Sequence, residues 1–225
     1  MLALKQALSL VSTPKLNGWL PSDETSLEAW YRKGKLITLN GTDVADWEDS
    51  SGNGLTMSQG IEGKQPAYSA GVLTFLSTAR DYLQTSGQIE LSGEFTIGIR
   101  ISPVSGATGT FLGDNTDSGE RFKVTADDTL LIAIGGSSKN FTLDSGSFGD
   151  DYWVITRNGS DLISLWVNGV VQADTETLTG AALIDAISVR FENIDNFDGT
   201  ISEIQIYSSS SAGLTANVND RLSTL

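Results

Sequence analysis

The chain has 225 residues, and its 28 acidic and 14 basic side chains give a formal net charge of −14. It contains no Cys and no His, which excludes disulfides, thiolate or imidazole metal ligands and His-assisted nucleophiles. An acidic surface of this kind repels phosphate backbones, and the apolar stretches are too short to cross a bilayer. We therefore expect no nucleic-acid partner and no membrane insertion.

Residues 2–12 place apolar side chains at the spacing of one helix face, namely Leu4, Ala7, Leu8 and Val11. Pro14 ends this helix, and residues 15–25, which include Trp19, are predicted to form an extended arm. The start lacks a small-x-small cleavage site, so we interpret it as retained in the mature protein. A helix this short is marginal alone in water, so its apolar face should dock on its own domain or on a neighbouring subunit. The sequence leaves these two alternatives open.

From Leu27 onward the pattern is that of short strands separated by turns, with 24 Gly against 4 Pro in the chain. The segment 94–102 alternates well, because Phe95, Ile97, Ile99 and Ile101 share one face. Further strands are predicted at 35–39, 72–75, 110–113, 121–125, 129–134 and 140–143.

Residues 152–171 form the clearest local signal. Two apolar runs are joined by Asn158-Gly159, and the second continues into a third through Asn168-Gly169. Asn-Gly favours tight hairpin turns in which both central residues have positive φ. The segment therefore predicts three adjacent antiparallel strands.

Two more strands and a helix complete the chain. Strands are predicted at 186–192 and 199–207, and the odd step from Ile201 to Ile204 predicts a β-bulge near Ser202-Glu203. The last residues, 216–225, have helical spacing and an expected cap at Thr215. The whole pattern indicates an all-β, two-sheet antiparallel jelly-roll sandwich with a short N-terminal helical arm and a short C-terminal helix.

Four segments in order resemble the concanavalin A-like jelly roll of the laminin-G-like and pentraxin-like superfamily. They are the opening LEAWY at 27–31, the WEDSSGNG turn at 47–54 followed by Gln65-Pro66, the strands ending in VNG at 167–169, and DGTISEIQIY at 198–207 followed by Leu214-Thr215. The resemblance implies one β-sandwich domain over residues 27–225, preceded by an anchoring arm over residues 1–26.

This superfamily includes lectins, adhesion modules, glycosidases and virion proteins, so the resemblance implies a fold and leaves the activity open. The chain combines an N-terminal arm with one such domain and lacks Cys and His. This combination resembles virion structural proteins of tailed bacteriophages. We predict a non-enzymatic capsid decoration or tail/fibre-like protein, located in the virion, without a cofactor. Its arm would contact other virion proteins through Leu4, Leu8, Val11 and Trp19. Self-association as a trimer and contact of the loops with host-surface glycans are further expectations.

The alternative is a calcium-assisted, lectin-like carbohydrate-binding module, extracellular or on a cell surface. Asp114, Asn115 and Asp117 supply the oxygen ligands that calcium takes, near the place where pentraxin-like relatives carry an Asp-Asn calcium pair. A second candidate set is Asp195, Asn196 and Asp198. Asp and Asn are also enriched in turns for backbone reasons, and that interpretation stays open for both sets.

A glycoside hydrolase is less favoured, because it needs two carboxylates flanking the scissile bond. The glycosidases of this fold carry an E-x-D-x-(x)-E strand, which is absent here; Asp198 with Glu203 is among the nearest approaches. Exposed aromatic side chains would favour sugar binding. We interpret Trp30, Trp153 and Trp166 as core, Trp47 as packed under its own turn and Trp19 as an anchor of the arm.

Overall fold

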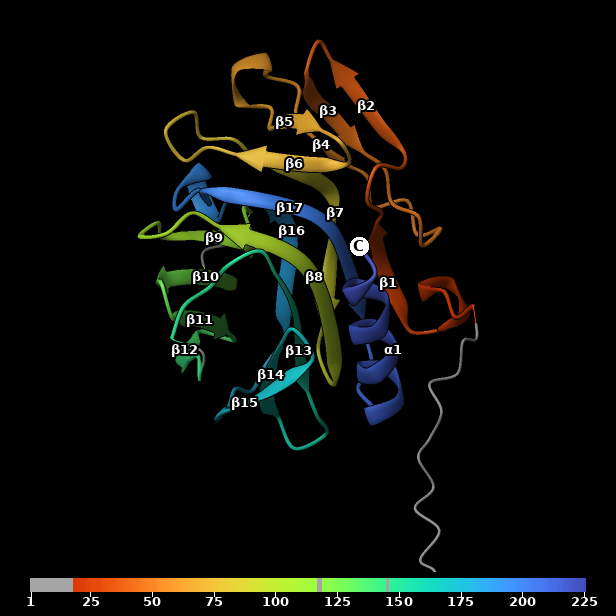
Figure 1. Ribbon diagram of the computed structural model, residues 1–225, viewed down its shortest axis with the longest axis vertical. Coiled ribbons are helices and arrows are strands. Elements are labelled where there is room, and N and C mark those ends of the chain that lie inside the picture. Colours follow the sequence, from red (N-terminus) through yellow and green to blue (C-terminus); the bar gives the residue numbers. More distant parts are fainter. Residues whose placement is uncertain (1–17, 117–118, 145) are drawn as a thin grey trace, which may run out of the picture.

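The computed structural model describes residues 18–116, 119–144 and 146–225, and within them it shows 17 β-strands and one α-helix (Figure 1). The helix predicted at 2–12, with Leu4, Leu8 and Val11, lies outside the described residues. The described part of the chain contains no helix with the length and hydropathy that crossing a bilayer requires.

The first sheet contains the double hairpin predicted from residues 152–171. Its strands are β1 (Leu27–Tyr31), β6 (Val72–Phe75), β17 (Gly199–Tyr207), β8 (Phe95–Pro103), β13 (Asp151–Arg157), β14 (Leu162–Val167) and β15 (Val170–Thr177). β17 pairs with β1 and β6 along one side and with β8 along the other, and β8, β13, β14 and β15 follow in antiparallel order. The register of β17 against β8 shifts between Ile201 and Glu203, which confirms the predicted bulge.

The second sheet lies against the first. Its strands, in spatial order, are β7 (Leu83–Leu91), β16 (Ala182–Ile187), β9 (Gly109–Gly113), β10 (Arg121–Ala126), β11 (Thr129–Ile134) and β12 (Ser137–Thr142). Four short strands link the two sheets at one end of the sandwich, which is the top in Figure 1: β2 (Ile37–Asn40), β3 (Asp43–Trp47), β4 (Met57–Ser58) and β5 (Ala67–Ser69).

The core fills the space between the sheets. Phe111 of β9 and Trp153 of β13 come from opposite sheets, and their ring centroids lie 5.4 Å apart. The predicted inward face of β8, with Phe95, Ile97, Ile99 and Ile101, is buried in this core. These observations confirm the expected two-sheet, antiparallel fold class.

A second cluster covers the outer face of the first sheet. The helix α1 (Ala212–Ser223) packs against β8 and β13, and its Val218 and Leu222 contribute to this cluster together with Trp30 and Val154. A Cβ atom at Gly98 would lie 2.4 Å from Val218 Cγ1, so this position has to be glycine for the helix to approach β8.

Three local predictions were wrong in detail. Ser211, and not Thr215, caps α1, since its Oγ accepts the Leu214 N–H at 3.0 Å. The strand predicted at 186–192 is β16, which ends at Ile187 because Ser188 has a φ of 70°.

The third concerns the Asn158-Gly159 turn. Asn168 and Gly169 both have positive φ, as expected. Asn158 and Gly159 do not, and in this loop the residue with positive φ is Asp161. The Asn158 Oδ1 accepts the N–H groups of Ser160 and Leu162, which stabilises a longer connection than a tight hairpin turn.

Candidate ligand-binding pocket

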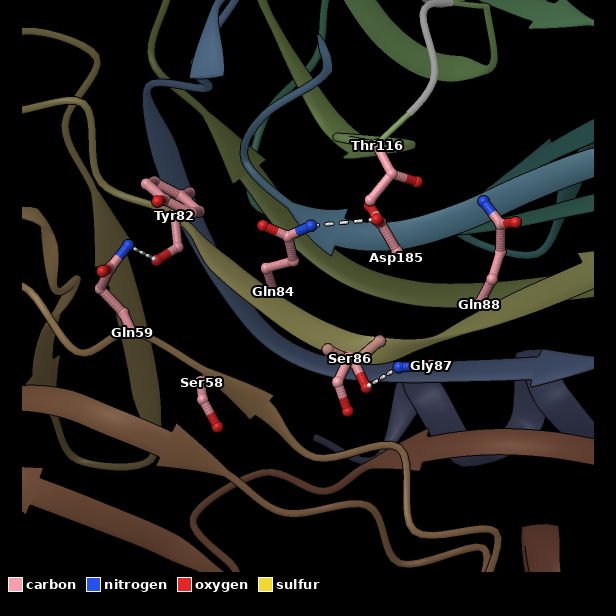
Figure 2. Close-up of a pocket in the computed structure, with 10 residues that line it drawn as sticks. Ser58, Gln59, Tyr82, Gln84, Ser86, Gly87, Gln88, Thr116 and Asp185 are labelled. Atoms are coloured by element: carbon pink, nitrogen blue, oxygen red, sulfur yellow. Dashed lines mark hydrogen bonds between the residues drawn. The ribbon is translucent and has the colours of Figure 1, made fainter. Parts of the chain in front are cut away.

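A polar pocket of about 370 Å³ opens on the second sheet where β7 and β16 meet the loop after β9 (Figure 2). We call it the polar pocket, and it is lined by Ser58, Gln59, Tyr82, Gln84, Thr85, Ser86, Gly87, Gln88, Thr116 and Asp185. Apart from the Asp185 carboxylate, its lining side chains are uncharged at neutral pH.

An irregularity in the pairing of β7 with β16 shapes this pocket. Ile184 pairs with Ile89 and Ala186 with Gln84, so residues 85–88 form an extended bulge opposite Asp185. Such bulges redirect side chains out of the regular alternation. The signal in the sequence was Ser86-Gly87 inside a run of alternating residues, since a glycine within a strand often marks a bulge.

Asp185 is the central group of the polar pocket and is only 2% exposed. Its Oδ1 accepts the Asn115 N–H at 2.6 Å, and its Oδ2 accepts the Gln84 Nε2 at 3.0 Å, the contact drawn in Figure 2. Burial raises the pKa of Asp185, and these two hydrogen bonds oppose that rise. The Thr116 side chain also interacts with Asp185, and a carboxylate has about four lone-pair sites, so about one site is left for a ligand donor.

The predicted calcium residues Asp114 and Asn115 border the polar pocket. The Asp114 Oδ1 accepts the backbone N–H of Thr116 at 2.9 Å and its hydroxyl at 2.8 Å. The Asn115 Nδ2 donates to Gln84 Oε1 at 2.9 Å and to Asn193 Oδ1 at 3.1 Å. These contacts shape the loop and orient Gln84, which is the role expected from turn chemistry.

Asp117 of the same set lies outside the described residues, so calcium binding at this loop stays a prediction. Within residues 18–116, 119–144 and 146–225, no cluster of three or more Asp, Glu, His or Cys side chains could hold a metal ion. In the second candidate set, Asp195 forms ion pairs with Arg190 at 2.6 Å and Lys123 at 3.1 Å. Asp198 accepts the Ser77 N–H at 2.7 Å.

A second concavity, of about 680 Å³, lies on the first sheet between α1 and the strands β13 and β14. We call it the aromatic groove because Tyr152 and Trp166 line it, together with Thr156, Asn158, Ser164, Asn219 and Asp220 among others. Trp166 was predicted to lie in the core, and this was right only in part. It faces outward on β14, packs against the second cluster and is partly exposed.

Three other tryptophans agree with the sequence interpretation. Trp30, Trp153 and Trp47 are buried. Trp19, named as a partner-binding residue, packs against the second cluster, and its Nε1 donates to Glu24 Oε1 at 2.9 Å.

Glu203, considered above as half of a carboxylate pair, is fully buried. Its carboxylate accepts hydrogen bonds from Trp30 Nε1 at 3.0 Å and from Arg221 Nε at 2.6 Å. These bonds tie α1 to β1 and β17, so Glu203 has a structural role.

No protein-family model matches the chain, and no curated protein sequence matches it either. Solved structures do match. The binding domain of botulinum neurotoxin serotype C1 superposes with a TM-score of 0.56 at 14% identity, covering 92% of this chain and 53% of that chain. The serotype D ligand binding domain, solved with N-acetylneuraminic acid, gives 0.55 at 16% identity, covering 87% and 51%.

The chain therefore spans about half the length of these neurotoxin domains. At such identities the likeness concerns the fold alone. It agrees with the antiparallel jelly-roll sandwich expected from the sequence.

Proposed function

We propose that the protein is a non-enzymatic glycan-binding module whose polar pocket takes one uncharged sugar unit. The observation that carries this proposal is the buried Asp185 carboxylate, held by Asn115 and Gln84 at the base of a pocket with neutral polar walls. Sugar hydroxyls donate to such a carboxylate in charge-assisted hydrogen bonds. The amides and hydroxyls around it bond the remaining hydroxyls, and the Tyr82 ring offers an apolar surface.

The charge of the lining favours a neutral sugar. None of the described residues that line the pocket is Lys or Arg, and the chain as a whole has a net charge of −14. An anionic sugar would meet the Asp185 carboxylate without a compensating cation. The serotype D domain was solved with N-acetylneuraminic acid, an anionic sugar, so the proposal takes from that neighbour only the general class of glycan ligands.

The lining also supports recognition without cleavage. Hydrolysis of a glycosidic bond needs two carboxyl groups about 5–10 Å apart across the bond. Within the part of the chain that the structure describes, the polar pocket supplies one, because Asp185 is the single acidic residue of its described lining and Asp114 is fully buried.

A glycan array with and without calcium, followed by titration of the sugars that bind, tests this proposal. Asp185→Asn keeps the shape and removes the charge, and Gln88→Ala removes an exposed amide at the rim. We expect a loss of affinity of at least tenfold for Asp185→Asn and a smaller loss for Gln88→Ala, because hydrogen bonds to charged groups contribute about 1.5–3 kcal/mol.

Glu48→Gln is the matched control, since Glu48 is exposed and lies outside the pocket. It should bind like the unmodified protein. Absence of binding on the array in both conditions, or equal affinity of Asp185→Asn and the control, would disprove the polar pocket as a glycan site. Binding that requires calcium would favour the calcium-assisted form of the proposal.

We also propose that the arm attaches this module to a larger assembly, most simply a phage capsid or tail. What supports this is the helical spacing of Leu4, Leu8 and Val11 in the sequence, together with Trp19, which packs on the second cluster and holds the first described residues against the domain.

A further inference from the structure

The aromatic groove is formed by a part of the first sheet that α1 leaves open. Successive outward positions of β14 are Leu162, Ser164 and Trp166. In the register with β13, Trp166 pairs with Val154 and Ser164 pairs with Thr156. Val154 belongs to the second cluster, and Trp166 packs against that cluster on one side and lines the groove on the other. The Ser164–Thr156 pair also lines the groove.

Aromatic faces and hydrogen-bonding groups therefore lie side by side in this groove. Ser164 and Thr156 lie directly opposite each other, and Thr156 is the diagonal neighbour of Trp166. Diagonal neighbours are about 7–8 Å apart, which is still within reach of an aromatic side chain. Tyr152 adds a second ring at the same end as the β14–β15 turn, where a Cβ atom at Gly169 would lie 3.3 Å from the Tyr152 hydroxyl.

The α1 wall of the groove contains an acceptor without a partner. Asn219 Nδ2 donates to the Thr215 carbonyl at 2.9 Å, but Asn219 Oδ1 is buried and has no hydrogen bond within the described residues. A buried, unsatisfied polar atom costs about 1–3 kcal/mol. A hydroxyl donor from a ligand in the groove would remove that cost after a small rotation of the amide.

The charges of the groove restrict the class of ligand. Among the described residues that line it, Asp220 is the one that is charged, and none is Lys or Arg. Phosphates, sulfated sugars and acidic peptides would be repelled. An amphipathic helix needs a largely apolar groove, whereas apolar and polar surface are mixed here and nine of the fifteen lining residues carry a hydroxyl or an amide.

We propose that the aromatic groove binds an uncharged glycan chain, with one sugar ring stacked on Trp166 and its hydroxyls bonded to Ser164, Thr156 and Asn219. The groove volume of about 680 Å³ exceeds the 370 Å³ of the polar pocket, which suits several sugar units rather than one. This site lies on the first sheet and the polar pocket on the second, so it extends the proposed function but can be tested separately.

The test uses the full-length, ¹⁵N-labelled protein and defined probes: cellohexaose, xylohexaose, mannohexaose, maltohexaose and, as an anionic comparison, hexagalacturonate. We expect at least one neutral probe to shift the amide resonances of β14 and α1 residues that line the groove. Trp166→Ala should weaken that probe at least tenfold, while Trp166→Phe should restore affinity to within about threefold of the unmodified protein.

Leu39→Ala is the control, because Leu39 is an exposed apolar residue on β2, away from both sites. Circular dichroism melting of all three variants verifies that they are folded. Unchanged affinity in Trp166→Ala, or equal binding of hexagalacturonate, would overturn the groove proposal. Resonance shifts confined to β7 and β16 would also overturn the groove proposal, while supporting the polar pocket as a glycan site. Shifts confined to β14 and α1 would support the groove and contradict the polar pocket.

Discussion

Asp81 shows at the scale of one residue what burial does to a carboxylate in this fold. It is 4% exposed, and its Oδ2 accepts the Leu76 N–H at 2.9 Å. Burial, with smaller contributions from Asp43 and Asp198, raises its pKa from 3.8 to about 6. Its charged form is thus less stable in the folded than in the unfolded chain. The stabilisation of the fold by protonated Asp81 is complete below pH 3.8 and is lost as the pH rises through about 6.

Asp81→Asn should therefore stabilise the protein at neutral pH. The amide oxygen can still accept the Leu76 N–H, and no charge is buried. We expect a free energy of unfolding about 2 kcal/mol higher than that of the unmodified protein at pH 7.5, with the difference vanishing near pH 3.5. Urea unfolding across this pH range measures it. The exposed Glu48→Gln serves as control and should show no such pH-dependent gain; an equal gain there would exclude Asp81 as the cause.

At the scale of elements, the close approach of α1 to the first sheet depends on Gly98. Its added Cβ would lie 2.4 Å from Val218 Cγ1 and 3.2 Å from Leu222 Cδ1. Gly98→Ala should displace α1 and lower the free energy of unfolding by about 1–3 kcal/mol, the usual cost of overpacking. Hydrogen exchange should show reduced protection in α1 first.

Gly60→Ala is the matched control for this substitution, because a Cβ there would meet nothing within 4 Å. Unchanged protection of α1 in Gly98→Ala would mean that the helix does not need this close contact. Since α1 forms one wall of the aromatic groove, Gly98→Ala should also alter binding there while leaving the polar pocket unaffected.

At the scale of the whole molecule, we expect the arm to mediate assembly and the domain to fold without it. Deletion of residues 1–17 keeps Trp19 and the Ser26–Ser209 hydrogen bond of 2.6 Å, so the domain should retain its melting temperature. If the arm mediates assembly, the full chain should sediment as a trimer and the shortened chain as a monomer that no longer joins its assembly. Analytical ultracentrifugation and an incorporation assay measure the two effects.

A full-length variant with Leu4, Leu8 and Val11 changed to Ser distinguishes apolar docking from chain length and should behave like the deletion. Sedimentation of the full chain as a monomer would contradict the trimer. Unaffected incorporation of both variants would contradict the role of the arm.

Local chemistry was enough to predict most strands. The alternation of β8 and the residue range of β17 with its bulge follow from side-chain periodicity, which depends only on which face of a strand is buried. The acidic composition predicted that nucleic acid is not a partner, and the absence of His and Cys excluded imidazole and thiolate chemistry. These conclusions also needed only the sequence.

The sites could not be predicted in this way, because they depend on which distant segments meet. Asp185 acquires its role from Gln84 and Asn115, which are far from it in the sequence. Trp166 lies in an alternating strand whose sequence predicts a core position. Its partial exposure depends on how much of the sheet α1 covers. The sequence by itself determined a two-sheet jelly roll with an acidic surface, since burial periodicity is local. Only the tertiary structure decided which polar and aromatic side chains share a cavity, since that depends on long-range register and packing.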